Sequence, residues 1–314
     1  MKRAFLFVGL VVVVALLSSC AREAPAEKEK ILIGFAQSTM IDPWRINMLK
    51  QMEDAVVQHA DRVDFVYTDA QNDNLRQISD VEDLQQRGVD VLVISPLEAA
   101  PLTPVVSKAY NSGTPVITLD RNITTEDYTC FIGASNVEIG EAAGRLLIDK
   151  LGEAGKVIEI QGILGASATI DRHTGFHNIV GKYPGIKIIV DKTANYLRTE
   201  AIDVMEDALQ AQPEIDAVYA HNDEMALGAL KAAKEAGRAD GLIIIGIDGQ
   251  REAYEAIVRG EMTATFVYPN GSAEAIEIAL RIADGEQAPK LLRLKTTQVT
   301  AENVKDLIDE KSYF

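Results

Sequence analysis

The fold is decided by the stretch Tyr219-Ala220-His221-Asn222-Asp223-Glu224-Met225-Ala226-Leu227-Gly228. Its first residues continue an apolar run that is typical of a buried strand. A polar turn then opens a helical segment that ends before Gly237, a residue suited to a helix C-terminus. Asn222 and Asp223 therefore lie at the carboxyl end of a strand, where ligands bind in open parallel sheets. A helix N-cap is the competing interpretation for both side chains.

The same order of strand, turn and helix recurs along the chain. Continuous apolar strands indicate a parallel sheet covered on both faces, and their alternation with helices is typical of a doubly wound α/β fold. Strands are predicted at residues 31–36, 63–67, 89–94, 115–119, 156–160, 186–190, 215–220, 242–247 and 263–268. Helices are predicted at residues 43–60, 74–87, 102–110, 136–151, 170–182, 198–211, 223–236, 251–258 and 272–283.

Strand number and glycine placement refine this picture. The predicted strands are more than one small sheet needs, so we expect two parallel-sheet lobes. The chain is expected to cross between them near residues 131–135 and to return near 268–270 and 293–295. Six glycines follow predicted helices, as C′ residues do: Gly88, Gly113, Gly152, Gly237, Gly260 and Gly285.

The N-terminus has the pattern of an export signal. A short positive segment precedes an apolar run from Phe5 to Leu17 that is too short for a comfortable membrane span. The run ends in Ser18-Ser19-Cys20, which resembles the lipobox of bacterial lipoproteins and implies a diacylglycerol anchor on Cys20. An ordinary secretory signal with an incidental cysteine is the alternative. Residues 21–30 are charged and contain almost no large apolar side chain, so we expect a flexible tether.

Charge and cysteine content exclude several classes of protein. The formal net charge of −16 argues against binding nucleic acid or anionic lipid electrostatically. Cys130 is the only cysteine besides Cys20, so lipidation of Cys20 would leave no partner for an intrachain disulfide. Cys130 adjoins Phe131 and Ile132 and is expected to be buried in the core.

Polar side chains follow six of the predicted strands. Because the carboxyl ends of parallel strands face a common ligand crevice, we expect these side chains to converge. Carboxylate and amide oxygens accept from sugar hydroxyls, and arginine donates in a fixed fork. Trp44, the only tryptophan, can offer a flat face to sugar C–H groups, although a core role is the alternative. The strand ends carry Asp42 with Arg45, Ser95, Asp120 with Arg121, Asp171 with Arg172, Asn222 with Asp223, and Asp248.

Several motifs, in this order, resemble the ribose-binding family of periplasmic sugar-binding proteins, the receptors of ABC importers. They are Asp42-Pro43-Trp44-Arg45, Thr118-Leu119-Asp120-Arg121, Glu159-Ile160-Gln161-Gly162, Gly165-Ala166-Ser167, Asp171-Arg172, Gly175-Phe176, Asn222-Asp223-Glu224-Met225-Ala226-Leu227-Gly228 and Gly246-Ile247-Asp248-Gly249. Within that family they are most similar to the galactofuranose-binding receptor. The resemblance spans essentially the whole mature chain.

The resemblance implies a type I periplasmic binding protein fold, in which two lobes joined by a multi-strand hinge close over a ligand. The chain then divides into a signal peptide (1–19), a tether (20–30), an N-terminal lobe (31–134 with 269–294) and a C-terminal lobe (135–268 with 295–314). The implied ligand contacts are Asp42, Trp44, Arg45, Ser95, Asp120, Arg121, Arg172, Tyr196, Asn222, Asp248 and Tyr268.

Departures from the ribose binders bear on the ligand. Asp42 and Ser95 fall where that group has asparagine, Arg45 replaces an aromatic residue, and Tyr196 replaces a phenylalanine that stacks on the sugar. Tyr268 falls near a glutamine that contacts the ligand, in an ambiguous part of the alignment. A galactofuranose- or galactose-like hexose is therefore favoured over ribose, and an acidic sugar stays open.

The expected role is that of an exported, membrane-anchored sugar receptor, monomeric and without a cofactor, that delivers a monosaccharide to an ABC permease. A receptor that presents a sugar or signal molecule to a chemoreceptor or histidine kinase is the alternative. An enzyme is not expected, because Gly34-Phe35-Ala36-Gln37 lacks a dinucleotide fingerprint.

His173 and His177 have the spacing of a metal-binding pair. No third ligand is close in sequence, so a solvated helix face is predicted there.

Replacing the predicted lipidated cysteine tests the anchor. Cys20→Ser removes the sulfur that would carry the lipid, so the protein should move from the membrane fraction to the soluble fraction after cell lysis. Immunoblotting of the two fractions measures the shift. A variant that stays with the membranes as the wild type does would contradict the lipobox prediction.

Overall fold

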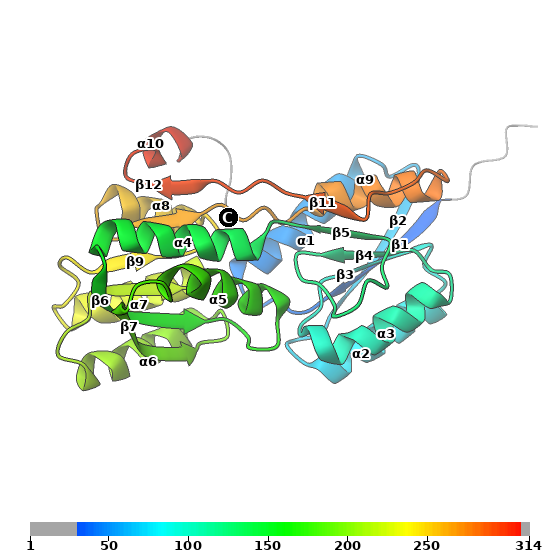
Figure 1. Cartoon of the computed structure of the whole chain (residues 1–314). Helices are drawn as coiled ribbons and strands as arrows, with labels where there is room; N and C mark the ends of the chain where they lie inside the picture. Colours follow the sequence, from blue (N-terminus) through cyan, green and yellow to red (C-terminus); the bar gives the residue numbers. More distant parts are fainter. Residues whose placement is uncertain (1–29, 309–314) are drawn as a thin grey trace, which may run out of the picture.

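A computed structural model describes residues 30–308 of the chain as two lobes lying side by side. Each lobe is built on one six-stranded sheet flanked by helices (Figure 1). The predicted fold class, two parallel-sheet α/β lobes, is confirmed. The predicted signal peptide, Cys20 and most of the tether lie outside the described residues. Within the described part, none of the helices is both long and apolar enough to cross a membrane.

The first sheet is parallel throughout, with the strand order β11-β5-β4-β3-β1-β2. Its strands are β1 (Ile31–Gln37), β2 (Val63–Asp69), β3 (Val91–Ile94), β4 (Val116–Leu119), β5 (Cys130–Gly133) and β11 (Leu291–Arg293). β3 and β4 are buried along their whole length, which explains their uninterrupted apolar sequences.

The second sheet repeats this plan in the order β12-β10-β9-β8-β6-β7. Its strands are β6 (Ala154–Gln161), β7 (Gly185–Thr193), β8 (Ala217–Ala220), β9 (Ile243–Ile245), β10 (Ala264–Phe266) and β12 (Gln298–Thr300). β12 runs antiparallel to β10 at the edge, and the other pairs are parallel. In both sheets the order reverses next to the first strand, so the loops that follow the strands flank a crevice.

Helices cover both faces of each sheet. They are α1 (Pro43–Val57), α2 (Asn74–Gln86), α3 (Ala99–Asn111), α4 (Asn136–Leu151), α5 (Ser167–Val180), α6 (Arg198–Ala211), α7 (Asp223–Glu235), α8 (Arg251–Val258), α9 (Ser272–Ala283) and α10 (Val304–Leu307). Neighbouring strand residues point to opposite faces: Val93 packs in one hydrophobic core with α1 and α9, and Leu92 packs in another with α2 and α3. α4 packs against α5, and α6 against α7.

The chain passes between the sheets three times. It leaves the first sheet after β5 and enters α4, which packs in the second lobe. After β10 it returns to α9, where the Ser272 hydroxyl donates to the Met48 carbonyl of α1 over 2.7 Å. Its last passage joins β11 to β12 (Figure 1).

The sequence-based strand list lacks β5, β11 and β12. The last two are only three residues long and carry few buried side chains. β5 is apolar, but its residues were assigned to the junction between lobes. α3 begins three residues earlier than expected, since Pro101 lies in its first turn, where proline is tolerated. The six glycines expected after helices all have positive φ, as predicted, and Cys130 is fully buried.

Two glycines allow α4 and α5 to approach closely. A Cβ on Gly175 would lie 2.1 Å from the Val137 carbonyl oxygen, and one on Gly140 would lie 2.3 Å from the Arg172 carbonyl oxygen. Backbone atoms cannot move aside as a flexible side chain does. This contact therefore fixes the position of the α5 segment that carries Arg172.

Gly175→Ala should destabilise the protein by about 1–3 kcal/mol, because the steric cost of an added core methyl exceeds the helix propensity that alanine gains. Urea unfolding measures this change. Thr174→Ala, at the exposed neighbouring position, is the control and should stay within about 0.5 kcal/mol of the wild type. A stabilised Gly175→Ala variant would show that the two helices are not in backbone contact.

Candidate ligand-binding site

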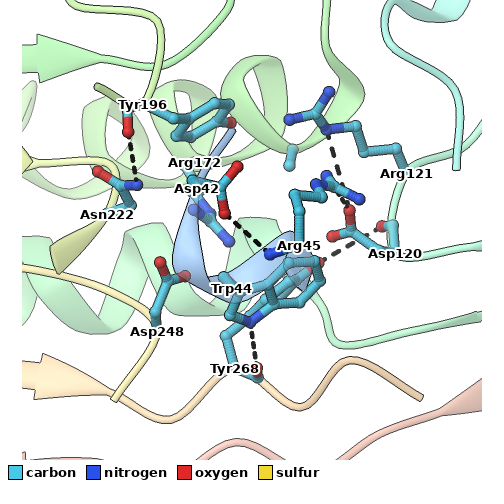
Figure 2. A pocket seen from close by; sticks show the side chains of 11 residues that line it. Asp42, Trp44, Arg45, Asp120, Arg121, Arg172, Tyr196, Asn222, Asp248 and Tyr268 are labelled. Atoms are coloured by element: carbon cyan, nitrogen blue, oxygen red, sulfur yellow. Dashed lines mark hydrogen bonds and ion pairs between the residues drawn. The ribbon is translucent and has the colours of Figure 1, made fainter. Parts of the chain in front are cut away.

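A cavity lies between the two lobes, at the carboxyl ends of their strands. Figure 2 shows side chains from both lobes facing one another across it. Its lining consists of Asp42, Trp44, Arg45, Asp120, Arg121, Ala168, Arg172, Tyr196, Asn222, Asp248 and Tyr268. The structure therefore brings together every predicted contact residue except Ser95, and it adds Ala168.

A buried charge cluster forms the wall from the first lobe. Arg45, near the start of α1, donates from Nη2 to the Asp120 carboxylate over 2.6 Å and from Nη1 to the Ser95 hydroxyl over 2.7 Å. Arg121 Nε lies 3.9 Å from the same carboxylate, and its Nη1 donates to the Leu97 carbonyl. Ser95 is thus behind the wall, where it holds Arg45 rather than lining the cavity.

The Asp120 carboxyl is held in its charged form. Burial raises its pKa, but the guanidiniums of Arg45 and Arg121 lower it more, so the pKa is below its usual value. Asp120 has φ +65°, a left-handed conformation that is uncommon for residues other than glycine. Such strain is typical of functional sites, where the surrounding structure holds the backbone in place.

Arg172 forms the centre of the wall from the second lobe. Its Nε donates to the Asn136 side-chain oxygen over 2.8 Å, and its Nη1 donates to the His221 carbonyl. Asn136 also donates to the Tyr268 hydroxyl over 3.0 Å, and the Arg172 guanidinium lies 4.6 Å from the Tyr268 ring centroid. Two of the three guanidinium nitrogens are therefore fixed by protein, while Nη2 has no hydrogen bond to the described residues.

Among the carboxylates that line the cavity, that of Asp248 has the fewest hydrogen-bond partners within the described residues. It lies after β9 with φ +132°, and no donor among the described residues bonds to its carboxylate. Burial raises its pKa well above the usual range, although Arg172 opposes this shift. The Asp223 carboxylate stabilises the turn that follows Asp248, accepting from the backbone N–H groups of Gly249 and Gln250 over 2.9 and 2.8 Å.

Aromatic rings supply the apolar surface. The Trp44 and Tyr268 ring centroids are 5.6 Å apart, and the Trp44 Nε1–H donates to the Tyr268 carbonyl over 3.0 Å. Tyr196 comes from the second lobe, with its hydroxyl 2.6 Å from Thr169 Oγ1. A Cβ on Gly162 would lie 2.0 Å from the Tyr196 ring, so only glycine leaves room for this ring.

Two lining residues are also helix caps. Asp42 accepts from the Arg45 N–H over 2.9 Å at the start of α1, and Asn222 accepts from the Met225 N–H over 2.9 Å at the start of α7. Burial raises the pKa of Asp42. Each cap uses only one side-chain oxygen. Asp42 and Asn222 can therefore cap a helix and line the cavity at the same time. Trp44 likewise belongs both to the hydrophobic core and to the cavity wall.

The lobes touch directly beside the cavity. The Ala99 N–H of the first lobe donates to the Gly165 carbonyl of the second over 2.9 Å. The Asn122 N–H donates to the Ser167 hydroxyl over 2.9 Å. The structure is therefore a closed arrangement, in which a bound ligand would be largely removed from water.

Residue patterns missed two contributors to the cavity region, Asn136 and Ala168. Asn136 follows the junction between lobes, and its only signal was a Ser-Asn pair suited to a helix start. Ala168 has no polar group to reveal it. His173 and His177, predicted to lie on a solvated helix face, are each 37% exposed, and both rings also contact the buried carboxylate of Glu159 from strand β6.

Asp120→Asn keeps a side chain that tolerates positive φ but removes the charge between two guanidiniums. It should lower the free energy of unfolding by about 3 kcal/mol, as expected when one partner of a buried ion pair is lost. Urea unfolding measures the loss. Ser95→Ala, which removes a neutral hydrogen-bond partner of Arg45, should cost only about 1 kcal/mol. Equal losses in the two variants would contradict this role of the Asp120 charge.

Comparison with known proteins identifies the family. Residues 33–287 match the periplasmic binding protein domain family. The chain is 36% identical to the ribose import binding protein RbsB of Bacillus subtilis (91% of this chain, 92% of the relative). It is 32% identical to the galactofuranose-binding protein YtfQ of Escherichia coli (95% of each chain).

A solved structure, the fructose-binding periplasmic domain of a hybrid two-component system, superposes with a TM-score of 0.85 at 37% identity. The alignment covers 88% of this chain and 93% of that domain. These findings confirm the resemblance to the ribose-binding family and imply an extracytoplasmic location. The chain belongs to the periplasmic binding proteins of the sugar-import type, with the two-lobed type I fold.

Proposed function

We propose that the protein closes its two lobes over one neutral monosaccharide, with a galactofuranose- or galactose-like hexose favoured, and delivers it to the permease of an ABC importer. The observation that carries this proposal is the buried cavity lined by three arginines and three aspartates contributed by both lobes. By family, its relatives are binding proteins, and no catalytic step is proposed.

The charges in the cavity favour a neutral ligand. The formal charges of Arg45, Arg121 and Arg172 are balanced by those of Asp42, Asp120 and Asp248 only when all three carboxyls are ionised, since burial raises the pKa of Asp42 and Asp248. With all three carboxyls ionised, a uronic acid would add a negative charge to a balanced, buried group, which costs free energy unless a proton or cation accompanies it. A neutral sugar brings hydroxyls that donate to Asp248 and accept from the free nitrogen of Arg172.

Volume and aromatic surface favour a single sugar ring. The space between the two walls is small, so an oligosaccharide would need the lobes to stay apart. Trp44, Tyr196 and Tyr268 offer ring surface to the apolar C–H groups of a sugar, and burying this surface supplies affinity. Among the relatives, the galactofuranose-binding protein supports a hexose, and Arg45 at a position that is aromatic in ribose binders supports a departure from ribose.

The N-terminal signals complete the proposal. A lipid on Cys20 would hold the receptor at the membrane surface, and the tether of residues 20–30 would let it reach the permease. We propose a monomer, since two lobes of one chain line the whole cavity.

A sensor is the second candidate, in which the closed receptor signals to a histidine kinase or chemoreceptor. The similarity to the periplasmic domain of a hybrid two-component system favours it. The ligand clamp would be the same in both roles, so the partner decides between them. Co-purification of the exported protein with a permease supports the importer, and co-purification with a sensor kinase supports the alternative.

Removing one ligand partner from each lobe tests the site. In calorimetry on residues 21–314, freed of co-purified sugar, Arg121→Ala and Asp248→Ala should each weaken sugar binding by at least about 30-fold, equal to about 2 kcal/mol for a lost charged hydrogen bond. The panel contains galactose, galactofuranosides, ribose, arabinose, glucose and a uronic acid. Trp44 fluorescence should change with the sugar that binds.

Matched controls separate binding from folding. Arg145→Ala and Asp149→Ala remove the same charges from the exposed face of α4 and should bind as the wild type does. Far-ultraviolet circular dichroism should be unchanged in all four variants. Wild-type affinity in both site variants would overturn the assignment of this cavity as the sugar site.

A further inference from the structure

A second cluster of polar side chains lies within the C-terminal lobe, between sheet and helix. Glu159 projects from β6, the strand next to the edge strand β7, and is fully buried. His173 and His177 lie one turn apart on α5, with ring centroids 4.1 Å apart. The Glu159 carboxylate is 3.0 Å from His173 Nδ1 and 2.7 Å from His177 Nε2. Three side chains from two elements thus converge on one point.

This geometry has the features of a metal-binding site. One ligand atom from each of Glu159, His173 and His177 lies within 4.8 Å of the others. Histidines at i and i+4 share one face of a helix, which is the arrangement used for metal binding by helical motifs. Each histidine side chain is 37% exposed, so an ion and its water ligands can reach the ring nitrogens from solvent.

The buried carboxylate is oriented by a further histidine. His221 is fully buried, and its Nε2 lies 3.0 Å from Glu159 Oε1. Its Nδ1 has no hydrogen-bond partner among the described residues, so Nε2 carries the proton and donates to the carboxylate. Ligating carboxylates in metal sites are held in this way by an outer hydrogen bond. An ion pair made only for stability has no need of three imidazoles on one carboxylate.

We propose that Glu159, His173 and His177 bind a divalent transition metal ion of the zinc class. Two imidazole nitrogens and one carboxylate oxygen suit Zn²⁺, whereas Ca²⁺ and Mg²⁺ prefer oxygen ligands alone. Water completes the coordination on the exposed side. The assignment replaces the sequence-based expectation that this chain holds no metal, and it stands whether or not the cavity binds sugar.

The position of the site links it to the cavity wall. His173 follows Arg172 directly, and His221 precedes Asn222. The His221 carbonyl accepts from Arg172, so the residue that orients Glu159 also positions a cavity arginine. A bound ion would link α5 to β6 through its ligands and so restrict the movement of the cavity wall that contains Arg172. The expected consequence is a rise in thermal stability when the ion binds.

Zinc titration of the exported protein tests the proposal. The protein is stripped with EDTA, dialysed and titrated with ZnCl₂ in a calorimeter, and Co²⁺ absorption in the visible region reports the coordination geometry. The wild type should bind one ion per chain and show a higher Tm with zinc. His177→Gln and His173→Gln should weaken binding by more than about 100-fold, beyond the ~10–100-fold typical of losing an outer partner.

His59→Gln is the matched control, because His59 is the one histidine outside this cluster and lies just beyond α1 in the other lobe. It should bind zinc as the wild type does. His173 and His177 are partly exposed, so their variants should fold even if Glu159→Gln does not. The proposal is overturned if the wild type binds no zinc at 100 times the protein concentration. It is also overturned if both α5 variants bind zinc as tightly as His59→Gln.

Discussion

The Asp120 carboxylate, buried between the guanidiniums of Arg45 and Arg121, is the interaction on which the rest of the cavity depends. Guanidiniums removed from water are costly unless a partner compensates them. Arg45 comes from α1, and Asp120 follows β4, so the pair fixes the first helix against the sheet edge. In the second lobe, the Arg172 guanidinium is held by neutral oxygens, the side-chain oxygen of Asn136 and the carbonyl of His221, and not by a carboxylate. The lobes therefore meet with their charges already oriented for a polar ligand.

Backbone geometry delivers these side chains to one place. Asp120, Tyr196 and Asp248 all have positive φ, although none is glycine. Each follows a strand or a loop at the sheet edge, where a left-handed residue turns the side chain into the crevice. The free energy of this strain is offset by contacts such as those of Asp223, which caps the turn after Asp248. Within residues 30–308, no donor bonds to the Asp248 carboxylate and no acceptor bonds to Arg172 Nη2, and these are the groups that we propose for binding sugar hydroxyls.

Much of this architecture follows from local sequence. Continuous apolar runs such as that of β4 predict buried parallel strands, and glycines such as Gly237 mark helix ends because few other residues adopt positive φ. The charged residues at strand ends could be predicted to converge, since a parallel sheet brings those ends together. Short edge strands such as β11 carry too few side chains to be distinguished from loops. Ser95 and the Glu159–histidine cluster were misplaced because hydrogen-bond partners distant in sequence decide which way such side chains point.

The central claim is that the two lobes close over a sugar held between their charged walls. Small-angle X-ray scattering of the sugar-free protein, and of the same sample saturated with the sugar selected by calorimetry, tests it most directly. The account predicts a smaller radius of gyration with sugar and a scattering curve that matches the closed structure, since ligand contacts from both lobes shift the balance toward closure. An unchanged radius of gyration at saturating sugar would contradict it.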